Sequence, residues 1–167
     1  MIIPKSIRIL CVAACVTTGC TDENHSSKAK EAAESVFFDA SLKPDYQTKT
    51  IELYLPDDFI VAEESENNFI LEKSGNPYIL FVNPHENRKS RTLYDTVKQL
   101  NDKDIDLAHF EDQESFGFIS IRDLDEKKYE VSVGVGGVKL TTETNEKKLS
   151  DEAAQMMAIV DSITQEK

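Results

Sequence analysis

The sequence contains no cysteine after residue 20, because Cys11, Cys15 and Cys20 all lie in its first twenty residues. This absence excludes a disulfide framework in the folded part and leaves no thiolate there for a zinc site. The predicted folded part has two histidines, His85 and His109, and they do not form the HExxH spacing of a zinc peptidase. The sequence therefore predicts no metal site.

Basic residues are scarce. The chain has 19 lysines and arginines against 31 aspartates and glutamates, which gives a formal net charge of -12. Such a surface is repelled by phosphate backbones and anionic headgroups, so the charge disfavours nucleic acid and electrostatic lipid binding. Solubility alone explains an acidic surface, and the sharper interpretation is a basic partner.

Catalytic and cofactor motifs are also missing. There is no GxSxG nucleophile elbow, and the GVGGVK segment, residues 134–139, has neither the dinucleotide-binding nor the GxxxxGK spacing. Pairs of carboxylates are plentiful, but with 31 acidic residues they arise by chance and identify no acid/base couple. The sequence predicts no catalytic residue and no cofactor.

The segment DKDIDLAHFEDQ comes nearest to a metal motif, with Asp102, Asp104 and Asp106 at positions 1, 3 and 5 of a calcium loop. However, Leu107 replaces the glycine of position 6, and Gln113 replaces the glutamate of position 12. We therefore predict that Asp102 and Asp104 solvate a loop, and that Asp106 points outward from a strand.

The first twenty residues contain a short apolar run, residues 9–16, which follows Lys5 and Arg8 and no acidic residue. The run has about the length of a signal-peptide core. It is well short of the roughly 20 residues that a membrane-spanning helix needs. This segment is therefore predicted to be a signal peptide.

Three small residues, Thr17, Thr18 and Gly19, stand directly before Cys20. Together with the charges and the apolar run, they resemble a bacterial lipoprotein signal peptide that ends in a lipobox. The resemblance implies transfer of diacylglycerol to the Cys20 sulfur, cleavage that removes residues 1–19, and acylation of the freed amine. A secretory signal cleaved by the ordinary signal peptidase is the alternative.

Cleavage after Gly19 leaves Cys20 as the single cysteine of the mature chain and removes two positive charges. Two or more acyl chains, at about 0.8 kcal/mol per buried CH₂, anchor a protein stably where one chain is marginal. Thr21 follows the cysteine, whereas in enterobacterial lipoproteins an aspartate there tends to retain the protein in the inner membrane. The resemblance therefore favours the outer membrane, facing the periplasm, with the inner membrane as the alternative.

Residues 20–45 are predicted to hold the lipidated cysteine and a tether. The stretch TDENHSSKAKEAAES, residues 21–35, is polar and has no strand pattern, which is typical of a linker. Apolar residues recur at helical spacing in its second half and beyond, and they predict a short amphipathic helix over about 29–38. Pro44 then closes the segment.

Period-two alternation predicts strands after the tether. Ile51, Leu53 and Leu55 alternate with polar neighbours in a strand that starts near Tyr46 and ends at Pro56. Two strands over 69–73 and 78–83 are expected to form a hairpin. Four more strands are predicted over 105–111, 116–122, 129–135 and 138–144, the last two joined by a tight turn at two glycines.

Helical patterns predict two further helices. Thr92 and Asp95 approximate a capping box before a helix over about 93–101. A final helix is expected to begin at Ser150 as N-cap. Met156 and Met157 fall in its apolar stripe, so they are predicted to pack in the core and not to bind a cofactor.

This order of elements predicts an α+β fold, an antiparallel sheet of about six to seven strands with helices packed on it, in one domain over 46–167. The segments TIELYLPDDF, KKYEVSVGVGGVKL and SDEAAQMMAIVDSI, placed around a hairpin and a middle helix, resemble the PsbP-like α/β/α sandwich, including bacterial lipoproteins of the DcrB type. The resemblance implies a non-catalytic accessory or adaptor protein.

The sequence thus predicts a lipid-anchored, periplasm-facing, non-catalytic accessory protein of the bacterial cell envelope that binds a protein partner. An immunity lipoprotein that neutralises a basic toxin is the first alternative, favoured by small size and acidic charge. An envelope hydrolase that uses carboxylates is the second. A cleft in which two carboxylates converge would favour the hydrolase.

Overall fold

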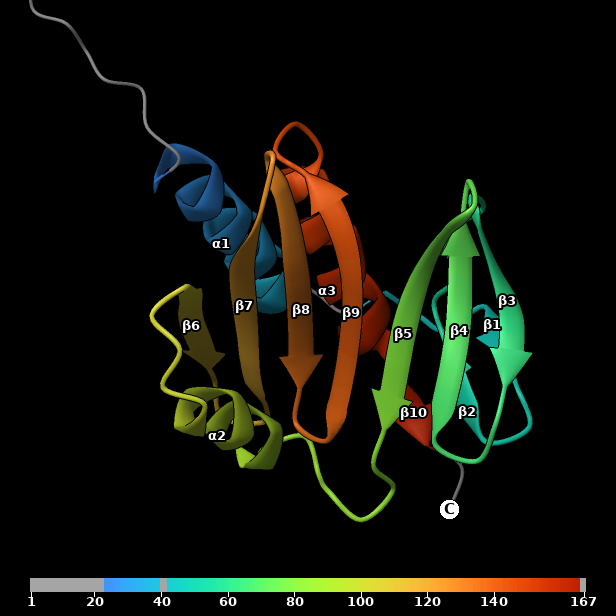
Figure 1. Ribbon diagram of the computed structural model, residues 1–167. Coiled ribbons are helices and arrows are strands. Elements are labelled where there is room, and N and C mark those ends of the chain that lie inside the picture. The colour runs from blue at the N-terminus through green and yellow to red at the C-terminus, as the bar shows by residue number, and fades with distance from the viewer. Residues whose placement is uncertain (1–22, 40–41, 166–167) are drawn as a thin grey trace, which may run out of the picture.

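The computed structural model describes residues 23–39 and 42–165, so the predicted signal peptide and Cys20 lie outside the described residues. Within these ranges, three helices pack on a seven-stranded antiparallel sheet (Figure 1), which confirms the predicted α+β class. In spatial order the strands of this sheet are β3 (Phe59–Glu64), β4 (Asn68–Lys73), β5 (Asn76–Val82), β9 (Val138–Asn145), β8 (Lys128–Val135), β7 (Phe116–Asp125) and β6 (Ile105–Glu111).

The sheet consists of two meanders. β3 to β5 are neighbours in sequence and in space, and so are β6 to β9. The meanders join where β5 pairs with β9, from Tyr78 opposite Thr142 to Val82 opposite Val138. Helix α2 (Thr92–Gln99) lies in the connection that carries the chain from β5 to the far edge strand β6 (Figure 1).

The β8–β9 turn confirms the hairpin predicted at the two glycines. Val135 pairs with Val138, and Gly136 has φ +57°, as the first central residue of a II′ turn requires. A Cβ at Gly136 would lie 2.3 Å from the carbonyl oxygen of Asn87. The turn therefore packs directly on the loop that precedes α2, and this contact fixes the backbone next to Arg88.

The prediction of a single strand from Tyr46 was wrong. The segment forms β1 (Tyr46–Gln47) and β2 (Ile51–Leu53), and β2 pairs with both β1 and β10 (Thr164–Gln165) in a separate small sheet. Strand β3 was not predicted. Its apolar residues are consecutive, and a bulge between Val61 and Glu63 shifts its register, so no period-two pattern marks it.

The helix predicted over about 29–38 is present, but it is longer than expected: α1 (Glu23–Phe38) takes up most of the predicted tether. Ala29, Ala33 and Phe37 form a buried stripe at four-residue spacing. This stripe packs against helix α3 (Leu149–Ser162). Small alanines mark an apolar face only weakly, although they allow two helices to approach closely. The folded unit therefore begins at α1 and not at the expected boundary near residue 46.

The helices lie on both faces of the sheet. On β7, Ile119 and Ile121 point into the core under α1 and α3. The alternating Phe116 and Phe118 contact Tyr94 of α2 on the opposite face, with ring centroids 5.2 and 6.2 Å away. The fold is therefore three layers deep, although α2 covers only one corner of its face (Figure 1).

None of the helices within the described ranges combines the length and the apolar character that crossing a membrane requires.

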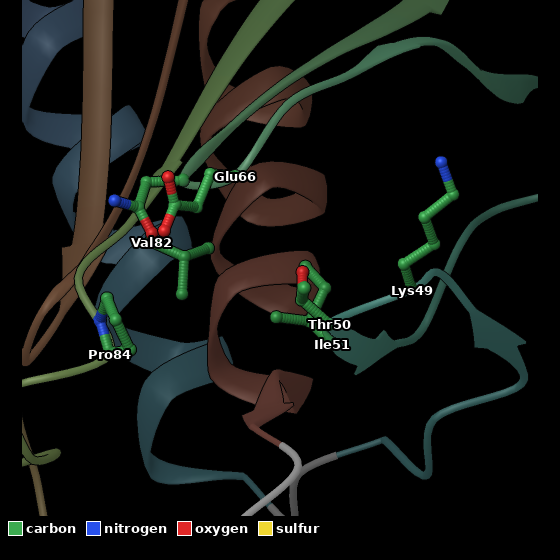
Figure 2. Close-up of a pocket in the computed structure, with 7 residues that line it drawn as sticks. Lys49, Thr50, Ile51, Glu66, Val82 and Pro84 are labelled. Atoms are coloured by element: carbon green, nitrogen blue, oxygen red, sulfur yellow. The ribbon is translucent and has the colours of Figure 1, made fainter.

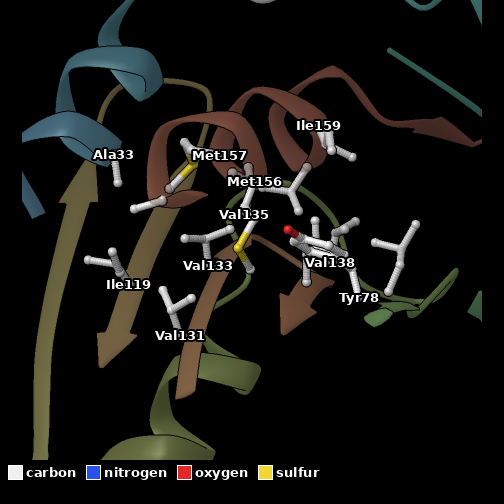
Figure 3. Close-up of a cluster of buried hydrophobic side chains, with 14 of the residues drawn as sticks. Ala33, Tyr78, Ile119, Val131, Val133, Val135, Val138, Met156, Met157 and Ile159 are labelled. Carbon is white, nitrogen blue, oxygen red and sulfur yellow. The ribbon is translucent and has the colours of Figure 1, made fainter. Parts of the chain in front are cut away.

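The main core lies between α3 and the sheet (Figure 3). Met156 and Met157 are completely buried there, which confirms that the methionine stripe packs in the core.

Both predicted helix caps were wrong. Arg91 and Lys148 occupy the N-cap positions and make no side-chain cap bonds. Thr92 is instead the first residue of α2 and donates its hydroxyl to Glu86, and Ser150 lies inside α3.

Candidate functional site

An open groove of about 500 Å³ lies among the C-terminal ends of α1 and α3 and the β6–β7 turn. We call it the α1–α3 groove. Its lining includes Phe38 and Leu42, whose exposed fractions are 55% and 46%, and the buried Ile163 near the end of α3. Large apolar side chains that gather in a concave, exposed site are typical of a binding surface.

Phe38 is exposed because the neighbouring Phe37 takes the buried position. Consecutive helical residues point about 100° apart, and on α1 Phe37 points into the core while Phe38 points away from it. Phe37 packs edge to face with Phe38 at 5.1 Å, and its ring covers Gly117 so closely that a Cβ there would lie 2.7 Å away. The packing of Phe37 in the core therefore fixes the position of Phe38 on the wall of the groove.

A buried ion pair holds the cation of the groove in place. Arg88 donates from Nε to the Ser115 hydroxyl and from Nη1 to the Asp161 carbonyl, both at 2.9 Å, and its Nη2 contacts the Asp161 carboxylate. The Asp161 side chain is only 5% exposed, whereas that of Arg88 is 41% exposed. Each terminal nitrogen of Arg88 thus keeps a second N–H that no described partner uses.

The rim of the groove is acidic. Asp39, Asp112 and Glu114 border it, against Lys43 and the Arg88 ion pair. The Asp112 carboxylate accepts hydrogen bonds of 2.7 Å from two backbone N–H groups of its own turn, so its position is fixed. The hollow continues past Arg88 as a second space of about 330 Å³ towards the β8–β9 turn. This shape suits an extended segment better than a small molecule.

A separate polar cluster joins α3 to the β4–β5 hairpin. Lys73 donates to both carboxylate oxygens of Glu152, at 3.2 and 3.4 Å, and Tyr78 donates its hydroxyl to the same carboxylate at 2.7 Å. The side chain of Glu152 is 6% exposed and that of Lys73 is 19% exposed. Each charge is therefore neutralised inside the cluster.

The cluster borders a small cavity of about 180 Å³ that also touches Glu143. Glu143 alternates along β9 with the buried Thr142, which faces the core, so the Glu143 side chain points to the opposite face of the sheet. The carboxylates of Glu143 and Glu152 therefore do not converge. Since the Glu152 carboxylate is bound by Lys73 and Tyr78, we interpret the cluster as a structural contact that stabilises the packing of α3 on the sheet.

The Tyr78 hydroxyl makes stability depend on pH. Burial and the hydrogen bond to Glu152 raise the pKa of Tyr78 well above its usual value near 10. The unfolded chain releases this proton as pH rises past about 10 while the folded chain keeps it, so folding stability falls by about 1.4 kcal/mol per pH unit above that point. In urea titrations from pH 7 to 11, Tyr78→Phe is expected to lose about 2 kcal/mol at neutral pH and to show a shallower alkaline decline than the wild type. Parallel declines would contradict this assignment.

Another pocket, of about 310 Å³, opens between β2, the β3–β4 turn and the end of β5. Figure 2 shows Thr50 and Ile51 of the β2 region opposite Val82 and Pro84, with the Lys49 side chain extending away from them. Its lining includes both Lys49 and Glu66, but no ion pair within the described ranges fixes either side chain. This pocket therefore offers fewer features that would select a particular ligand than the α1–α3 groove does.

The residues of the calcium-like segment do not form a cation site. Asp106 is exposed on a strand, as expected, and Lys30 of α1 donates to its two carboxylate oxygens at 2.9 and 2.7 Å. Burial raises the pKa of Asp106, but the hydrogen bonds from Lys30 and Ser26 outweigh it and the net pKa is lowered. The Asp102 carboxylate accepts the N–H of Asp104. Among the described residues, no group of His, Cys, Asp and Glu side chains gathers as a metal site.

The histidines and the arginines of the loop before α2 are also separated. His109 is exposed on β6 and stacks on Phe116 with ring centroids 5.6 Å apart, while His85 lies exposed in the loop. Arg91 lies over the Phe116 ring, with its guanidinium carbon 4.5 Å from the ring centroid, and it pairs with Glu111. Arg88 instead points to α3. The basic residues of this loop therefore do not form a single basic patch.

No family model matches the chain, and a search of curated proteins finds no similar sequence. The proposal below therefore depends on the residues of this chain.

The groove residues were missed in the sequence because they come from distant segments. Arg88 and Asp161 have no local pattern that links them. The Phe37–Phe38 pair was the available signal, since on a helix with a single buried stripe one of two adjacent large apolar residues lies outside that stripe.

Proposed function

We propose that this chain is a lipid-anchored, non-catalytic binding protein of the bacterial cell envelope, attached through Cys20 and facing the periplasm. Its α1–α3 groove binds an extended, basic and apolar segment of an envelope protein. The observation that carries the binding proposal is the exposed pair Phe38 and Leu42 inside an acidic rim. Helices on both faces of an antiparallel sheet support the resemblance to the PsbP-like sandwich.

The chemistry of the groove selects its occupant. Phe38 and Leu42 offer apolar contact, so the bound segment presents apolar side chains. Asp39, Asp112 and Glu114 attract basic side chains at the rim and repel acidic ones. The Arg88 guanidinium keeps N–H donors for a backbone carbonyl of the segment. The carboxylate of Asp161 is bound by Arg88 and that of Asp112 by its own turn, which supports binding over hydrolysis.

The binding proposal is tested with a fluorescein-labelled peptide of alternating lysine and leucine. We expect the full chain to bind it, and to bind an alternating glutamate and leucine peptide at least about tenfold more weakly. The double variant Phe38→Ser/Leu42→Ser is expected to weaken the lysine-containing complex by about tenfold or more, since each apolar side chain buried on binding contributes about 1.5 kcal/mol or more. Fluorescence anisotropy measures all three affinities.

The matched control is Ile79→Ser/Leu100→Ser, because these side chains are similarly exposed, at 55% and 59%, outside the groove. Equal losses in both double variants, or equal affinity for both peptides, would refute the groove as the site. A photoreactive residue at position 42 in bacteria that make the full chain then captures the partner, with position 100 as control. A resident envelope protein supports the accessory role, and a secreted toxin supports the immunity role.

A further inference from the structure

Three segments meet at the end of the domain where α1 begins: the first turn of α1 over 25–28, the β7–β8 turn over 125–128, and the β9–α3 connection over 145–148 (Figure 1). His25 Nε2 lies 2.8 Å from the Glu146 carboxylate, and the Glu146 N–H donates to the Lys127 carbonyl at 3.2 Å. The Ser150 hydroxyl donates to the Lys28 carbonyl at 3.4 Å. These contacts define a single surface, which we call the α1-start surface.

This surface departs from the acidic character of the chain. Its three segments contain five lysines and three acidic residues, whereas the whole chain has 19 basic and 31 acidic residues. Asp22, Glu23, Asp123 and Asp151 flank these segments in the sequence, and counting them gives seven acidic residues against five lysines. Most of the excess negative charge of the protein therefore lies elsewhere. The five lysines are Lys28, Lys127, Lys128, Lys147 and Lys148.

The lysines are available for a ligand. All five are exposed, and the Lys127 side chain, at 77% exposure, has only the Glu146 carboxylate nearby, at 3.3 Å. The other four have no carboxylate within 4.0 Å among the described residues. Flexible ammonium groups of this kind bind phosphate as point charges.

The position of the surface identifies the ligand. Only Thr21 and Asp22 separate Cys20 from Glu23, where α1 begins. A lipid on Cys20 therefore brings the α1-start surface to the level of the headgroups. We infer that this surface lies against the bilayer and that its lysines bind the phosphates of anionic lipids. This inference rests on the proposed lipid attachment at Cys20, and it refines the prediction that overall charge disfavours headgroup contact.

The test uses the full lipidated chain in nanodiscs of phosphatidylcholine, alone or mixed with phosphatidylglycerol, and measures the acetylation rate of each lysine by mass spectrometry. We expect Lys127, Lys128, Lys147 and Lys148 to react about fivefold more slowly with phosphatidylglycerol present than in detergent. High salt is expected to remove this protection. Lys89 lies in the loop before α2, and Lys98 lies in α2. The acetylation rates of these two lysines are expected to stay unchanged.

A variant set separates lipid binding from general charge effects. Replacing the same four lysines by glutamine is expected to abolish the preference of the lipoprotein for phosphatidylglycerol vesicles over phosphatidylcholine vesicles, whereas Lys89→Gln/Lys98→Gln preserves it. Unprotected lysines on a chain whose Cys20 peptide carries lipid would overturn the inference alone. A Cys20 peptide without lipid would overturn the anchor and this inference together, and the peptide mass distinguishes the two results.

Discussion

Cys20→Ala is expected to abolish incorporation of labelled palmitate and to release the processed protein from the membrane fraction or leave its precursor uncut. The thiol is the only side chain that forms the thioether to diacylglycerol, so alanine cannot replace it. Each buried CH₂ of an acyl chain contributes about 0.8 kcal/mol, so losing two or more chains removes essentially all stable anchoring. Membrane fractionation and the mass of the mature N-terminal peptide measure the effect.

Cys11→Ala and Cys15→Ala are the matched controls, because both cysteines precede the predicted cleavage site. We expect both variants to be labelled, processed and membrane-bound like the wild type. If Cys20→Ala fractionates and is processed as the wild type is, the lipobox interpretation is wrong and the ordinary secretory signal becomes the better one.

Lys73→Met is expected to lower the free energy of unfolding by about 3 kcal/mol. Methionine preserves most of the aliphatic stem, but it removes the ammonium group that neutralises Glu152 and lies over the Phe59 ring. The carboxylate then remains buried with the Tyr78 hydroxyl as its one described hydrogen-bond donor. Urea denaturation of the purified chain measures the loss.

The double variant Lys73→Met/Glu152→Gln is expected to recover at least half of that loss, since an amide is far less costly to bury than an unpaired charge. Lys89→Met serves as the control for removing an exposed lysine and is expected to change stability by less than about 0.5 kcal/mol. Additive effects of the two replacements would show that Lys73 and Glu152 do not stabilise one another.

The spacing of apolar residues predicted those helices and strands in which one buried face is visible within the element's own sequence. The alternation of β8 and the glycines after it predicted a hairpin, and the stripe that contains Met156 and Met157 predicted a buried helix. It failed where tertiary contacts decide the structure. A helix over 29–38 was predicted, but its packing on α3 was not, and β2 joins β10 from the other end of the chain.

The candidate site was less accessible to prediction for the same reason. The partner of Asp106, Lys30, lies 76 residues away, on a helix that was expected to lie outside the folded domain. The Arg88–Asp161 pair spans 73 residues. Such pairings follow from the sheet order, which no local pattern contains. The lipid attachment at Cys20 is local in sequence and stays a prediction outside the described residues.

The length of α1 has a consequence for how the protein finds its partner. At 1.5 Å per residue, its 16 residues span about 24 Å between the end nearest Cys20 and the end that carries Phe38. With a lipid on Cys20, the groove is confined to a thin layer above the bilayer. A segment of another protein in that membrane then meets the groove by a search in two dimensions, at a raised effective concentration. A weak complex in solution therefore suffices for stable association at the membrane.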